Sequence, residues 1–123
     1  MNKNDILRGL TPTGYKFGVK FDKDAFNPER IDKIRNIIRM NIIPRKTINK
    51  NTSSSYNLKH IIERSIYAEQ HGIGYIGNGE LIYSMILEGY EVERNDNEVY
   101  FNITSRCVDN LNQNKRTYGQ AID

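Results

Sequence analysis

His60 and Glu63 are the pair whose spacing could support proton transfer or metal binding, because residues three apart on a helix share one face. A zinc site needs three or four ligands. The sequence adds only one more histidine, His71, and one cysteine, Cys107, with no Cys-x-x-Cys or His-x-x-x-His pair. We therefore expect no metal site. We interpret His60 as a structural or surface residue, His71 as a loop residue and Cys107 as a partly buried structural thiol, since no base that would activate the thiol is visible in the sequence.

The glycines at 72, 74, 77 and 79 raise the question of a phosphate-binding loop. A Gly-x-Gly-x-x-Gly string indicates a dinucleotide site where it follows a strand, and a P-loop ends in Gly-Lys-Ser/Thr. Neither requirement is met here. The sequence thus predicts no catalytic residues and no cofactor, and we expect a binding protein rather than an enzyme.

The basic residues are concentrated in the first half of the chain. Residues 1–64 contain 14 Lys and Arg against six Asp and Glu, whereas residues 65–105 contain only Arg94 against seven acidic residues. Such asymmetry indicates a charged partner. Asn and Ser donors lie among the cations of residues 45–64, a mixture that suits phosphate contacts, although a solvated connector is the alternative. The predicted nucleic-acid-binding residues are Arg45, Lys46, Lys50, Lys59 and Arg64.

Hydrophobic spacing and turn residues predict the elements that position these groups. Period-two alternation indicates strands, apolar residues three and four apart indicate helices, and Asn27-Pro28-Glu29 has the composition of a helix start. Glycines and the Asn95-Asp96-Asn97 turn separate the later elements. The predicted elements are a strand over 13–22, a helix over 28–41, a helix from 54 or 55 to 66, a loop over 70–77, a helix from 78 to 88 and a hairpin over 90–103.

This order of one strand, three helices and a C-terminal β-hairpin predicts an α+β, winged-helix-like domain. We expect a single domain over residues 1–123, with flexible ends at 1–12 and 106–123. No apolar run approaches the roughly 20 residues that span a bilayer, the N-terminus lacks a signal-peptide pattern, and one cysteine excludes an internal disulfide. Together these features predict a cytoplasmic protein without a membrane partner.

The acidic residues fall on the two elements that contact DNA in a winged helix, the third helix and the hairpin. Carboxylates at these positions repel phosphate. They fit instead a basic protein surface, such as a nucleic-acid channel, where complementary charge raises both the rate and the specificity of association. The predicted partner-binding residues are Glu80, Glu88, Glu91, Glu93, Asp96 and Glu98.

Three strings, SSYNLKHIIER, YIGNGELIYSMILEGYEV and NEVYFNIT, resemble a family of small accessory proteins of phages and other mobile elements. The resemblance covers residues 44–104. It implies a mobile-element setting inside a host cell and, as a further step, inhibition of a host defence machine, most concretely an anti-CRISPR protein acting on a Cas nuclease. The positions that match are Ser54, Ser55, Tyr56, Leu58, Lys59, His60, Asn78, Gly79, Glu80, Gly89, Tyr90, Tyr100, Phe101 and Asn102.

Three functions therefore stay open. The first is an inhibitor that binds a host protein or ribonucleoprotein through its acidic residues, while its basic connector touches guide RNA or target DNA. The second is a small winged-helix-like regulator that binds nucleic acid. The third is an enzyme that uses His60 and Glu63. The sequence leaves the oligomeric state and the identity of the target open.

Overall fold

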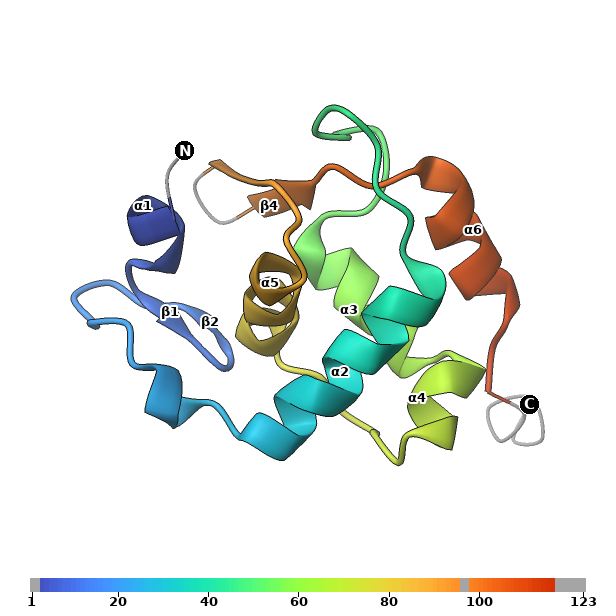
Figure 1. Cartoon of the computed structure of the whole chain (residues 1–123), viewed down its shortest axis with the longest axis horizontal. Coiled ribbons are helices and arrows are strands. Elements are labelled where there is room, and N and C mark those ends of the chain that lie inside the picture. The colour runs from blue at the N-terminus through green and yellow to red at the C-terminus, as the bar shows by residue number, and fades with distance from the viewer. Residues whose placement is uncertain (1–2, 96–97, 117–123) are drawn as a thin grey trace.

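The computed structural model describes residues 3–95 and 98–116 as helices and two short antiparallel hairpins (Figure 1). The protein is therefore α+β, as the sequence predicts. Its elements are α1 (Lys3–Leu7), β1 (Leu10–Thr11), β2 (Gly14–Tyr15), the 3₁₀ helix η1 (Lys23–Ala25), α2 (Pro28–Asn41), α3 (Ser55–Glu63), α4 (Ile66–Gln70), α5 (Asn78–Leu87), β3 (Val92–Asn95), β4 (Glu98–Phe101) and α6 (Ser105–Gln113).

Helix α5 lies at the centre of the fold. Helices α2 and α3 pack against it, and the β1–β2 hairpin lies beside it (Figure 1). Seven of its ten residues are buried. A helix that is covered on most sides needs apolar or small residues around most of its circumference, as α5 has. Leu81, Ile82, Met85 and Ile86 form the buried apolar face of this helix, as the spacing of apolar residues predicts. The helix begins at the predicted residue, Asn78, and Gly77 is its N-cap.

Helix α2 confirms the predicted helix over 28–41. Asn27 Oδ1 accepts the N–H groups of Glu29 and Arg30 at 2.9 and 3.2 Å, and the fixed φ of Pro28 suits the first turn. The isoleucine stripe of α2 is buried, and full burial of one such side chain stabilises the fold by about 2 kcal/mol. The buried residues of the stripe are Ile31, Ile34, Ile37 and Ile38.

The predicted second helix is divided in two. Helix α3 ends at Glu63, and α4 begins at Ile66. Ser65 makes the break, since its hydroxyl donates to Ile62 O at 2.6 Å and accepts the N–H of Ala68 at 3.3 Å. Residues 71–77 form the predicted loop.

The hairpin predicted over 90–103 is present, but it is not the C-terminal element, because α6 follows it. Strands β3 and β4 pair antiparallel, with Val92 opposite Phe101 and Asn95 opposite Glu98. Phe101 is fully buried, as is Ile103, which forms an isolated bridge with Pro44. This bridge joins the hairpin to the connector between α2 and α3.

The strand predicted over Thr13–Asp22 is wrong. Only Gly14–Tyr15 is a strand, paired with Leu10–Thr11, and residues 16–20 form an exposed loop. The alternation of Phe17 and Val19 with lysines imitates a half-buried strand. However, Gly18 has a φ of +77°, which an extended strand does not contain.

The flexible ends predicted at 1–12 and 106–123 need correction over the described residues. Residues 3–11 form α1 and β1, and they bury Ile6 and Leu10. Residues 105–113 form α6, which packs against α3 and buries Cys107, Val108 and Leu111 along one face. Within the described parts of the chain, no helix is both long and apolar enough to cross a bilayer.

Candidate functional site

The charged residues of the two halves of the sequence meet across the fold. Arg35 Nε and Arg39 Nε, on α2, lie 2.6 and 2.8 Å from the two carboxylate oxygens of Glu88, at the end of α5. The Glu88 side chain is only 10% exposed. Burial opposes its ionisation, but the hydrogen bonds from Arg39 and Arg35 outweigh that effect, so the pKa of Glu88 lies below its ordinary value.

A second ion pair joins α2 to the start of α5. Arg30 donates through Nε and Nη2 to Glu80 Oε2 and Oε1, at 2.8 and 2.9 Å, and Nη2 also donates to Tyr75 O at 2.6 Å. This bidentate geometry gives the strongest kind of Arg–carboxylate pair. The hydrogen bond with Glu80 raises the pKa of Arg30 above its ordinary value, although burial opposes the rise.

These pairs correct the predicted acidic surface. Glu80 and Glu88 are among the predicted partner-binding residues, yet both carboxylates face arginines of α2. Glu93 Oε2 lies 2.5 Å from Lys50 Nζ, and the hydrogen bond from Lys50 lowers the pKa of Glu93. Glu98 is exposed and accepts a hydrogen bond from the Tyr100 hydroxyl at 2.9 Å. Asp96 lies outside the described residues.

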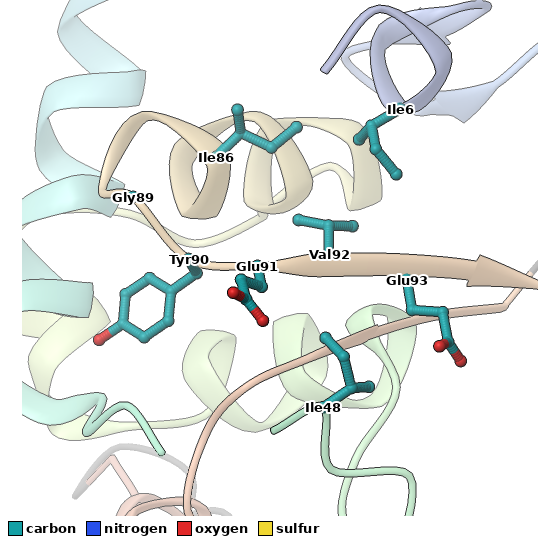
Figure 2. Close-up of a pocket in the computed structure, with 8 residues that line it drawn as sticks. All are labelled: Ile6, Ile48, Ile86, Gly89, Tyr90, Glu91, Val92 and Glu93. Carbon is teal, nitrogen blue, oxygen red and sulfur yellow. The ribbon is translucent and has the colours of Figure 1, made fainter. Parts of the chain in front are cut away.

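Glu91 and Glu93 line a hollow of about 510 Å³ beside β3 (Figure 2). Ile6, Ile86 and Val92 point toward one another on one side of the strand, and Ile48 lies on the other side with the two glutamates. The hollow is therefore half apolar, and one of its two carboxylates is already paired with Lys50. This hollow therefore has little negative charge with which to bind a basic partner.

His60 and Glu63, the pair with possible chemistry, form part of a structural cluster. His60 Nδ1 lies 3.0 Å from Glu63 Oε1, and Lys59 Nζ lies 3.4 Å from Oε2. Glu63 Oε2 also accepts the N–H of Ile76 at 2.7 Å, which fixes the loop before α5. Within the described residues, no three His, Cys, Asp or Glu side chains gather as metal ligands.

The predicted basic residues differ in exposure and in their partners. Lys59 is 4% exposed and lies between the rings of Tyr56 and Tyr75, which excludes direct phosphate contact in this conformation. Lys50 pairs with Glu93. Arg45 donates to Thr47 O and Ile48 O in its own connector. Lys46 and Arg64 are exposed.

A different set of cations surrounds the largest hollow described, with a volume of about 950 Å³. We call it the cationic hollow. Every described residue that lines it is cationic, aromatic, glycine or valine, so the lining itself supplies positive charge and apolar surface. Its lining residues are Arg8, Gly9, Tyr15, Lys16, Phe17, Gly18, Val19, Lys20 and Arg94.

The exposed loop of the cationic hollow is anchored at its first residue. Lys16 N–H donates to Gly9 O at 2.8 Å. Gly9 has a φ of +79°, and a Cβ there would lie 2.8 Å from Lys16 O, so only glycine fits. Residues 16–20 are all exposed, and Phe17 is 106% exposed. The fold therefore holds a phenylalanine ring in water between two lysines.

The wall of the cationic hollow is formed by Tyr15 and Arg94. The Arg94 guanidinium lies 3.6 Å from the centre of the Tyr15 ring, and the Tyr15 hydroxyl donates to Ile6 O at 2.6 Å. Burial raises the pKa of Tyr15, and Arg94 partly offsets the rise. Tyr15 thus stays a neutral donor at physiological pH and holds β2 against α1.

The glycines before α5 position the hollow and leave no phosphate cradle. The string Gly72-Ile73-Gly74-Tyr75-Ile76-Gly77 follows α4 rather than a strand. Cβ atoms at Gly77 and Gly79 would meet Pro12 O at 2.1 Å and Thr11 O at 1.6 Å, so these glycines let the β1–β2 turn dock. The N–H groups of Gly77 and Glu80 already donate to Glu80 Oε1 and Pro12 O.

Sequence reasoning missed the cationic hollow because it treated Phe17 and Val19 as core residues of a strand. The signal available was Lys-Phe-Gly-Val-Lys, in which a glycine interrupts the alternation. Arg8 and Arg94 are far apart in sequence and carry no local signal.

No protein-family model matches the chain, and neither a curated protein nor a solved structure is significantly similar to it.

Proposed function

We propose that the protein binds nucleic acid through the cationic hollow. The observation that carries the proposal is the gathering of Arg8, Lys16, Lys20 and Arg94 around one hollow with two aromatic rings. Phosphates neutralised by such side chains release condensed counterions, which supplies most of the sequence-independent affinity of nucleic-acid-binding proteins.

The contrast with the other cations supports this assignment. Arg30, Arg35 and Arg39 are engaged by buried carboxylates, whereas Lys16 and Lys20 lie on an exposed loop. Arg8 pairs with Asp5 at 3.1 Å, but its side chain is 77% exposed, and exposed pairs of this kind add little stability. A phosphate can therefore compete with Asp5 for Arg8.

The inhibitor of a host defence machine, in its most concrete form an anti-CRISPR protein that binds a Cas nuclease, stays a prediction. Its acidic docking surface no longer includes Glu80 and Glu88. Its expected contact with guide RNA or target DNA is assigned to the basic connector, whereas the present proposal places nucleic acid at the cationic hollow. The winged-helix-like topology also stays a prediction, and nucleic-acid binding at the hollow does not depend on it.

The test measures fluorescence anisotropy of labelled DNA and RNA, single-stranded and duplex, between about 50 and 200 mM salt. We expect binding that weakens steeply with salt, and we expect Lys16→Glu/Lys20→Glu to lower the affinity by at least about tenfold. The matched control is Lys46→Glu/Lys115→Glu, which makes the same change in net charge at exposed positions outside the hollow.

The control should retain most of the affinity of the unchanged protein. Absence of binding to every nucleic acid at low salt would contradict the proposal. Equal losses in the two charge-reversed variants would show that net charge, rather than the hollow, attracts the ligand.

A further inference from the structure

The cationic hollow carries a feature that phosphate binding does not require. Phe17 is fully exposed at the centre of the loop, although Phe21 and Phe26, a few residues later, pack on Tyr83 with ring centres 5.5 and 4.6 Å away. Apolar rings are normally driven into the core. An exposed ring beside a cationic hollow indicates a ligand with an apolar face as well as negative charge.

We propose that the ligand is a single-stranded nucleic acid and that one base stacks on Phe17, an inference that rests on the proposed function. In a duplex the faces of the bases are covered by their neighbours, whereas a single strand offers them freely. Stacking on aromatic side chains is the usual way in which proteins bind single strands without sequence preference.

The neighbours of Phe17 fit this mode of binding. Lys16 and Lys20 lie on either side of Phe17 in the loop and line the same hollow, where they can contact the phosphates that flank a stacked base. The Arg94 guanidinium, stacked on Tyr15, gives a planar cation in the wall, and such planes also accept bases. The hollow therefore combines an exposed aromatic ring, a planar guanidinium and two lysines in one lining.

An anionic membrane is the other surface that lysines around a phenylalanine could meet. Membrane binding depends on the apolar area that enters the interface. In residues 16–20 that area comes from Phe17 and from Val19, which is 40% exposed. The apolar area of two side chains is enough to cover one base but is small for insertion into a bilayer. Arg94 and Tyr15 also line the hollow, and binding to a planar lipid surface would not require them.

The test uses the absence of tryptophan from the sequence. Phe17→Trp places a single tryptophan at the stacking position. We expect oligothymidylate of about 12 nucleotides to quench its emission. A duplex of the same length should quench it much less, and inorganic polyphosphate, which supplies charge without bases, should not quench it.

Affinity measurements give the second readout. Phe17→Ser should weaken binding to the single strand by about tenfold and leave polyphosphate binding unchanged. Met40→Ser, which changes an exposed apolar residue outside the hollow, is the matched control and should bind as the unchanged protein does.

The inference is overturned if Phe17→Ser binds the single strand as tightly as the unchanged protein, or if the duplex quenches Phe17→Trp as strongly. Phe17-dependent sedimentation with phosphatidylserine vesicles, without binding to oligothymidylate, would assign the loop to membranes. Binding of duplex alone would refute the single-strand inference and leave the proposed function intact, whereas binding of neither nucleic acid would refute both.

Discussion

Helix α2 and the exposed loop of the cationic hollow, residues 16–20, draw their cations from the same basic half of the sequence, yet these cations have opposite roles. On α2, Arg30, Arg35 and Arg39 reach carboxylates of α5 that are 7 to 10% exposed. At the hollow, Lys16 and Lys20 extend from an exposed loop beside an exposed phenylalanine. The first group holds two helices together, and the second group is available to a ligand.

This difference shows that a charge imbalance along a sequence does not locate a binding surface. The basic first half and the acidic second half meet in the folded protein, so much of the asymmetry is used between α2 and α5. What remains for a partner depends on which cations stay exposed once the helices have packed. Only the three-dimensional arrangement shows which cations those are.

The largest effect should come from breaking the ion pair at the start of α5. Arg30→Ala leaves the Glu80 carboxylate buried without its cation, so we expect a loss of about 3 kcal/mol in the free energy of unfolding. Urea denaturation measures this loss. The control Lys33→Ala removes a pair with Glu29 whose carboxylate is 80% exposed and should cost less than about 0.5 kcal/mol. Equal losses in the two variants would contradict the structural role of Arg30.

Glu88 should give the next largest effect. Glu88→Gln removes the charge that pairs with Arg35 and Arg39, and we expect a loss of about 2 kcal/mol at neutral pH. Because folding lowers the pKa of Glu88 below 4.5, its contribution is complete above that pH and disappears as the pH falls through the lowered pKa. Denaturation at pH 7 and at acidic pH should therefore show a difference between the two proteins that shrinks in acid. A difference independent of pH would show that the charge of Glu88 is unimportant.

The geometry of the hollow can be disturbed without removing charge. Gly9→Ala should cost about 1 to 2 kcal/mol, because the φ of +79° is unfavourable for alanine and its Cβ would press on Lys16 O. Displacement of the loop should also weaken oligonucleotide binding severalfold. Gly74→Ala, where a Cβ meets nothing within 4 Å, is the matched control for both measurements. Unchanged affinity of Gly9→Ala would show that the position of the loop is unimportant.

The smallest effect on stability is expected at the hollow itself. Lys16→Ala/Lys20→Ala should change the free energy of unfolding by less than about 0.5 kcal/mol, since both side chains are exposed. The slope of log affinity against log salt for a single strand should fall by roughly 1.4, which corresponds to two lost phosphate contacts. An unchanged salt slope would place these lysines away from the ligand.

The sequence predicts the parts of the fold that local chemistry determines. Asn27-Pro28 marks the start of α2, the isoleucine spacing marks its buried face, and the β3–β4 hairpin follows from alternation around a turn. The Lys-Phe-Gly-Val-Lys segment has the alternation of a strand but forms a loop, because alternation alone does not show whether a second strand covers the apolar face.

The candidate site was less predictable than the fold, for a physical reason. Residues 30 and 80, or 35 and 88, come together only when α2 packs on α5, and no short-range pattern encodes that contact. Likewise Arg94 reaches Tyr15 across most of the chain length. The composition thus indicated a charged ligand, but it placed the cations in the connector 45–64 rather than in the hollow.

The most direct test of nucleic-acid binding at the cationic hollow is an NMR titration of the ¹⁵N-labelled protein with a single-stranded oligonucleotide. The proposal predicts that the largest amide shifts occur in residues 8–20 and at Arg94, with little change in 44–54. Largest shifts in residues 44–64, with residues 8–20 unchanged, would contradict it.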